Sequence, residues 1–133
     1  QLWVLLAFAC WTLLALMIGV GISRWSLILT GRAQLTDFPG DVAHGGTAYR
    51  RAVRAHANCV EGLPLFGGLL LLALATQRSA VTDPLAPWLL AARVVQSSVH
   101  VASTSVPAVN LRFAAFCVQL AIAVRWTWDL LAA

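Results

Sequence analysis

Charge is scarce in this 133-residue chain, and lysine is missing altogether. Only 11% of the residues are charged and 60% are hydrophobic, whereas a soluble domain carries about a quarter charged residues. All nine cations are arginines, opposed by four aspartates and a single glutamate. This composition excludes a disordered segment, a coiled coil and an ordinary soluble enzyme, and it predicts an integral membrane protein.

The formal net charge of +4 raises the question of a nucleic-acid partner. A nucleic-acid surface needs its cations clustered on a polar face, but these arginines separate apolar runs. We therefore expect no nucleic-acid partner, and we attribute the excess of arginine to membrane topology.

The apolar residues fall into four long stretches. A bilayer core of about 30 Å needs roughly 20 helical residues, and each stretch is long enough to cross it once. Four strands are too few to close a barrel, so helices are the structure that lipid permits. We predict a single all-α domain, a membrane-embedded four-helix bundle, with helices over residues 2–23, 49–77, 84–106 and 110–133. The first stretch lacks the basic leader of a signal peptide, and we expect it to be a retained span.

Arginines gather on one side of these predicted spans. Five flank the loop 24–48 and the connection before the fourth stretch: Arg24, Arg32, Arg50, Arg51 and Arg112. The other side has Arg78 and Arg125. The positive-inside rule then places the long loop in the cytoplasm and both termini outside. Trp126 and Trp128 are predicted to lie in the aromatic belt at the far interface.

A polar stripe runs along the start of the second stretch. Arg51, Arg54, Asn58 and Glu61 are spaced by three, four and three residues, which puts them on one face of a helix. The uncharged run that follows covers only about 22 Å, so Asn58 and Glu61 are drawn to the membrane edge or inside it. Charged groups at that depth face a bundle interior or a water-filled cavity. The stripe therefore predicts a site for a polar ligand.

The third stretch has a matching polar face, with Arg93, Gln96 and His100 at helical spacing. Glu61 and Arg93 lie roughly 18–20 Å from the cytoplasmic ends of their helices. We predict that these two residues share a buried polar cluster, within one subunit or across a subunit interface. The alternative is a buried ion pair that sets the register of the helices and has no chemical role.

Unpaired cations on the cytoplasmic side favour an anionic ligand. Arg51, Arg54 and Arg112 outnumber the single glutamate, and a guanidinium binds a carboxylate through two hydrogen bonds. We predict a cationic cleft that opens toward the cytoplasm, with Glu61 deeper inside.

The histidines and cysteines of the predicted spans allow other kinds of site. His56 and His100 lie at similar depth and could hold a haem iron from two sides, or they bond to nearby carbonyls. The three cysteines, Cys10, Cys59 and Cys117, have no CxxC spacing and are expected to be small hydrophobic residues. We expect no metal site.

Residues 54–66, RAHANCVEGLPLF, resemble the Arg-Ala-x-x-Asn-x-x-Glu-x-x-Pro-x-Phe signature of the MAPEG family, the membrane-associated proteins of eicosanoid and glutathione metabolism. The four-span topology and the large first cytoplasmic loop are also similar to that family. The segment from Arg93 to His100, with Asn110-Leu111-Arg112 after it, resembles bacterial members. We therefore expect a bacterial-type member in the inner membrane.

The resemblance implies a homotrimer with glutathione as co-substrate, bound between neighbouring subunits. Arg54, Asn58 and Glu61 would hold its charged and amide groups, with Arg51 and Arg93 beside them, and Arg112 looks like the catalytic arginine that steadies the thiolate. A guanidinium next to a thiol favours the thiolate. The implied reaction is transfer of glutathione to a lipophilic electrophile, or reduction of a lipid hydroperoxide, with the second substrate coming from the bilayer.

The chain also departs from the family pattern. Gly62 stands where these enzymes commonly have an aromatic residue, and the glutathione-contacting tyrosines of the third helix are absent, since Tyr49 is the chain's one tyrosine. Because fold does not decide function, the alternative is a non-catalytic relative: a lipid-binding scaffold or an accessory subunit of a larger membrane complex.

Overall fold

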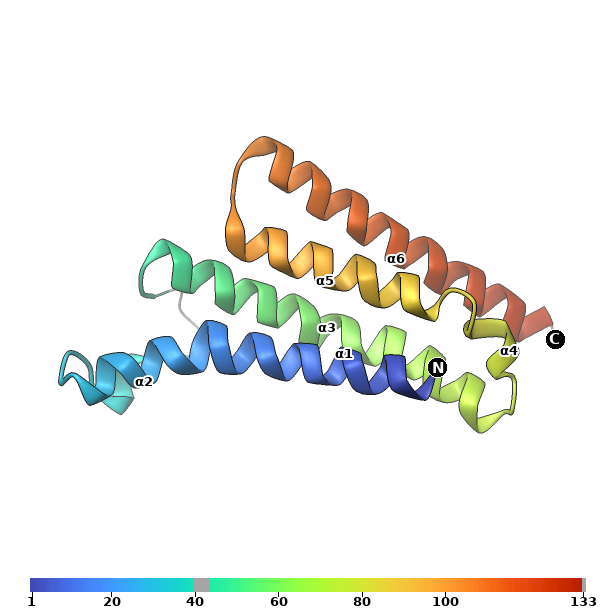
Figure 1. The fold of residues 1–133 in the computed structure, drawn as a ribbon, viewed down its shortest axis with the longest axis horizontal. Helices are drawn as coiled ribbons and strands as arrows, with labels where there is room; N and C mark the ends of the chain where they lie inside the picture. The colour runs from blue at the N-terminus through green and yellow to red at the C-terminus, as the bar shows by residue number, and fades with distance from the viewer. Residues whose placement is uncertain (40–43, 133) are drawn as a thin grey trace.

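The computed structural model describes residues 1–39 and 44–132, and its regular elements within those ranges are all helices (Figure 1). The first helix is continuous from Leu2 to Leu29. It contains α1 (Leu2–Leu14), the π-helical η1 (Ala15–Gly21) and α2 (Ile22–Leu29). The short 3-10 helix η2 (Leu35–Asp37) follows. The remaining helices are α3 (Thr47–Ala75), α4 (Ser79–Thr82), α5 (Ala86–Ala102) and α6 (Val106–Ala132). The prediction of an all-α chain is confirmed for the described residues.

The helix bounds differ from the prediction: α3 begins two residues early, α5 is shorter at both ends, and the first and last helices are longer. The first passes Ser23 and ends at Leu29, because an exposed helix can continue past its apolar stripe until a breaker, and Gly31 with φ +68° follows it. The last helix begins at Val106 rather than at Asn110, since a proline at position 107 is tolerated in a first turn.

Three helices are long and apolar enough to cross a bilayer: Leu2–Leu29, Thr47–Ala75 and Val106–Ala132. By length and composition, these helices agree with the prediction of an integral membrane protein. Helix α5 has 17 residues, which corresponds to about 25 Å of helix.

The long helices run side by side (Figure 1). Helix α3 packs against the first helix and against α5, and α5 packs in turn against α6. The connection from α5 to α6 and the segment after α2 lie at one end of the bundle, whereas α4 lies at the other.

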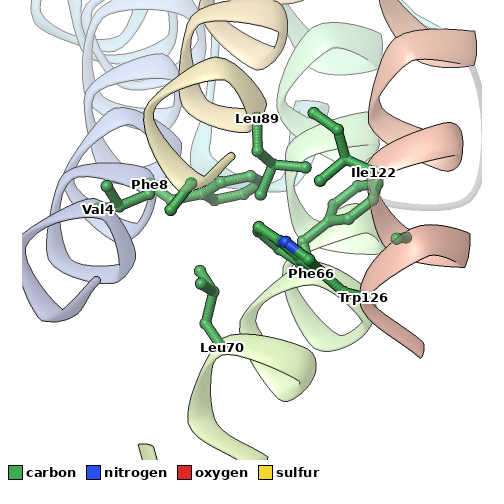
Figure 2. Packing of buried hydrophobic residues seen from close by; sticks show 9 residues of the cluster. Val4, Phe8, Phe66, Leu70, Leu89, Ile122 and Trp126 are labelled. Carbon is green, nitrogen blue, oxygen red and sulfur yellow. The ribbon is translucent and has the colours of Figure 1, made fainter. Parts of the chain in front are cut away.

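The apolar core lies toward the end of the bundle where α4 is found. Side chains from α1, α3, α5 and α6 meet there, and Figure 2 shows Val4, Phe8, Phe66, Leu70, Leu89, Ile122 and Trp126 around one centre. Trp126 is fully buried, so its predicted place in the interfacial belt is wrong. It lies four residues from Ile122 and from Leu130, on the inward face of α6, whereas Trp128 is 71% exposed.

Close approach of the first helix to α3 depends on a glycine. A Cβ added at Gly19 would lie 2.9 Å from the Cβ of Ala52, and neither atom can rotate away from its backbone. Small residues at such a crossing let helices pack closely in membranes.

Replacing Gly19 by alanine is therefore expected to force η1 away from α3 and to lower the free energy of unfolding by about 1–3 kcal/mol. Denaturation of the purified protein in detergent measures this loss. Gly21→Ala is the matched control within the same element, because its Cβ would meet only the Leu16 carbonyl oxygen at 3.5 Å. Equal losses for the two variants would contradict the packing argument.

Candidate functional site

A cavity of about 440 Å³ opens between α3, α5 and α6. Its polar lining consists of six side chains, Asn58, Glu61, Arg93, Gln96, His100 and Arg112. An apolar wall completes it, with Phe66 from α3 and Phe113 and Phe116 from α6. The cavity therefore combines a charged, hydrogen-bonding part with an aromatic part, as small-molecule sites commonly do.

Helical periodicity explains why these residues meet. On α3, Asn58, Glu61 and Leu65 recur every three or four residues, so their side chains share one face. Pro64 lies inside α3 and has no N–H, so the helix lacks one backbone hydrogen bond next to the cavity. On α5, Arg93, Gln96 and His100 follow the same spacing along the facing helix.

Arg93 is buried between two aromatic rings. It is 2% exposed, and its Cζ lies 5.3 Å from the centroid of Phe8 and 5.4 Å from that of Phe66. Its Nη1 donates to the backbone carbonyl of Asn58 at 3.0 Å, whereas its Nε has no partner. A guanidinium desolvated between rings gains about 2 kcal/mol from each favourable stacking geometry. The aromatic rings therefore compensate for the burial of this cation.

Glu61 and Arg93 line the same cavity, but no ion pair joins them. Glu61 is exposed rather than buried. The predicted alternative of a register-setting ion pair between these two residues is therefore absent from this part of the structure. The carboxylate stays available to another partner.

Gly62 makes room for Arg93. A Cβ at Gly62 would lie against the guanidinium, 3.0 Å from Cζ, and 3.1 Å from Cε2 of Phe66. This explains the missing aromatic residue at position 62, since the space beside the helix is already filled by the Arg93 side chain.

Asn58 and His100 contact each other across the cavity wall. The amide nitrogen of Asn58 lies 3.3 Å from Nδ1 of His100. His56 faces the opposite way, with its Nδ1 3.3 Å from the carbonyl oxygen of Thr12. The two histidines thus contact different neighbours, and the structure does not bring them together as a pair of haem ligands.

The remaining charged residues divide into two groups. Arg112 is half-buried and lines the cavity, whereas Arg54 is exposed. Both lie within electrostatic range of His100, and neither forms a hydrogen bond or ion pair with a described residue. Arg51 does not line the cavity, and its Nε donates to the carbonyl of Val101 at 2.9 Å. Arg54 and Arg112 are therefore the cations that remain available to an anionic ligand near this cavity.

Gln96 and His100 were predicted to share the polar face of Arg93, but neither was assigned to the glutathione site. Gln96 accepts a hydrogen bond of 3.0 Å from the buried Gln119 of α6, and His100 is held by Asn58. Their spacing from Arg93 indicated that they share one face of α5, and the structure adds that this face lines the cavity. No group of three or more histidine, cysteine, aspartate or glutamate side chains lies close enough to hold a metal ion in the described ranges 1–39 and 44–132.

Comparison with known proteins gives one match. The model of the MAPEG family matches residues 2–132, almost the whole chain. No curated protein and no solved structure matches the sequence.

Proposed function

Because the chain belongs to the MAPEG family, we propose that it is a membrane-embedded glutathione-dependent transferase or peroxidase that acts on lipophilic electrophiles or lipid hydroperoxides. The observation that carries this proposal is the set of charged groups without protein partners at the cavity. Arg112 and Glu61 line it, Arg54 lies near its His100, and none of the three is bonded to another described residue. Such groups are expensive in a membrane protein unless a ligand or a neighbour engages them.

The chemistry of these groups suits glutathione. The tripeptide carries two carboxylates, which guanidinium groups bind well, and one ammonium group, which a carboxylate binds. The cavity volume of about 440 Å³ falls in the range of small-ligand sites. Phe113 and Phe116 give it an apolar wall for the second substrate.

The proposed reaction starts when the glutathione thiol releases its proton to water. The Arg112 guanidinium favours the resulting thiolate, which keeps the electron pair. In the transferase reaction the sulfur forms a bond to the electrophilic carbon and the leaving group departs. In the peroxidase reaction two glutathione molecules are oxidised to the disulfide, while the hydroperoxide is reduced to an alcohol and water.

We further propose four membrane spans with α5 as the third, both termini outside the cytoplasm, and a bacterial-type homotrimer in the inner membrane. The exposure of Arg54 and Glu61 on α3 supports a neighbouring subunit at the site, because a ligand held there by one subunit would stay open on one side.

Replacing Arg54 by alanine is expected to weaken glutathione binding roughly ten- to hundredfold, because a charge-assisted hydrogen bond contributes about 1.5–3 kcal/mol. Titration calorimetry in detergent measures the dissociation constant. Arg125→Ala is the matched control, since this exposed arginine on α6 pairs with Asp129 and does not line the cavity. Its dissociation constant should equal that of the wild type.

The same titration tests the alternative of a non-catalytic scaffold or accessory subunit. That alternative is favoured by the contacts already made inside the site, where Arg93 packs between two rings and Asn58 is engaged by His100. Wild-type protein that binds no glutathione would support it and exclude the enzyme.

A further inference from the structure

The contact between Asn58 and His100 fits one tautomer of a neutral imidazole ring. The atom of Asn58 that faces His100 is the amide nitrogen, 3.3 Å from Nδ1. An amide nitrogen donates hydrogen bonds and does not accept them. With Asn58 as the donor, Nδ1 of a neutral ring is the acceptor, which corresponds to the tautomer with its proton on Nε2.

The Nε2 edge of this ring is free for a ligand. His100 lines the cavity, and its one hydrogen bond in the described chain is made by Nδ1. Arg112 lines the same cavity and lies within electrostatic range of the ring. A neutral N–H donor and a cation thus border one part of the cavity.

We propose that His100 donates a hydrogen bond from Nε2 to the sulfur of the glutathione thiolate, and that Asn58 is the positioning residue that holds the donor tautomer. The inference rests on the proposed function and adds a second group that stabilises the thiolate. The thiol proton leaves to water, the sulfur keeps the electron pair, and His100 remains neutral throughout. His100 is then a catalytic residue, and Asn58 acts through it.

Other hydroxyl and amide groups are less suited to this role. The chain's one tyrosine is engaged elsewhere, because the Tyr49 hydroxyl accepts from Nε of Arg24 at 2.6 Å. Gln96 lies one turn farther from the α5–α6 connection than His100, and its Oε1 accepts from Gln119 at 3.0 Å. His100 is thus the neutral hydrogen-bond donor that lines the cavity together with Arg112.

Two substitutions of His100 separate the two ring nitrogens. The amide nitrogen of glutamine occupies a position close to Nε2, whereas that of asparagine is close to Nδ1. We therefore expect His100→Gln to preserve the stabilisation of the thiolate and His100→Asn to lose it. The probe is glutathione itself, and the readout is the ultraviolet absorbance of its bound thiolate as a function of pH.

The midpoint of that titration is expected to rise by about one to two pH units in His100→Asn, since a hydrogen bond to a charged group contributes about 1.5–3 kcal/mol. It should stay within about half a unit of the wild-type midpoint in His100→Gln. Asn58→Leu, which frees the ring to change tautomer, should shift the midpoint in the same direction as His100→Asn. His56→Asn is the matched control, because His56 faces Thr12 and does not line the cavity.

The possible outcomes separate this inference from the proposed function. Wild-type protein without a thiolate signal at saturating glutathione overturns the proposed function. A wild-type signal with an unchanged midpoint in His100→Asn overturns only the role of His100. If His100→Asn does not fold, the midpoint of Asn58→Leu decides in the same way.

Discussion

Arg112→Ala is expected to lower the turnover of glutathione by about 10²–10³-fold, the usual loss when a preorganised group that stabilises developing negative charge is removed. The side chain is half-buried in the cavity wall and bonds to no described residue, so its charge is directed at the ligand. A half-buried cation acts on a neighbouring anion in surroundings of low dielectric, where the attraction is stronger than in water. Steady-state assays with a panel of electrophiles and hydroperoxides measure the effect.

Arg112→Lys provides the graded comparison for this experiment. It keeps the positive charge but loses the planar guanidinium, so an intermediate turnover is expected. Arg125→Ala, at the opposite end of α6, should leave the turnover unchanged. Wild-type turnover in Arg112→Ala would show that thiolate stabilisation lies elsewhere in the cavity.

Gly62→Phe is expected to be the most destabilising substitution in the cavity, with a loss of more than about 3 kcal/mol in the free energy of unfolding. Even the first carbon of the new side chain would collide with the Arg93 guanidinium, which is 2% exposed and held between Phe8 and Phe66. Overpacking by a single methyl already costs about 1–3 kcal/mol, and an aromatic ring is far larger. Denaturation in detergent measures the loss.

Gly68→Ala and Gly62→Ala are the matched pair for this argument, because both glycines lie inside α3. A Cβ at Gly68 has open space around it, so this variant should gain about 1 kcal/mol from helix propensity. Gly62→Ala should gain the same free energy from helix propensity, but the contact of its Cβ with Arg93 should lower the stability by more than that gain. Equal stability of the two alanine variants would mean that Arg93 moves aside without cost.

The fold could be predicted as far as hydropathy and helical periodicity determine it. Four apolar stretches indicated four long helices, and the described chain contains helices in each of those regions. Their ends could not be predicted, since an exposed apolar helix continues until a breaker such as Gly31. The burial of Trp126 was missed because tryptophan suits both an interface and a core, and only the packing of neighbouring helices distinguishes the two.

The candidate site could also be predicted only in part, because helical spacing shows which residues share a face of one helix. Spacing along α3 and comparison of depth indicated that Asn58, Glu61 and Arg93 lie near one another, and all three line the cavity. The partners of Arg93 could not be predicted, because spacing identifies which residues share a helical face but not what lies opposite. Phe8 is 85 positions away in the sequence, on another helix, and no local pattern links it to a buried cation.

The length of α5 has a consequence for how two unlike substrates reach one cavity. With 17 residues, this helix is about 5 Å shorter than an average hydrocarbon core. Hydrophobic mismatch of that size draws the headgroups and interfacial water inward at the short element. Where α5 crosses the bilayer as proposed, the bilayer would be thinned beside His100 and the turn into α6, which would shorten the path of a hydrophilic peptide, while Phe113, 66% exposed, offers an apolar surface at the cavity.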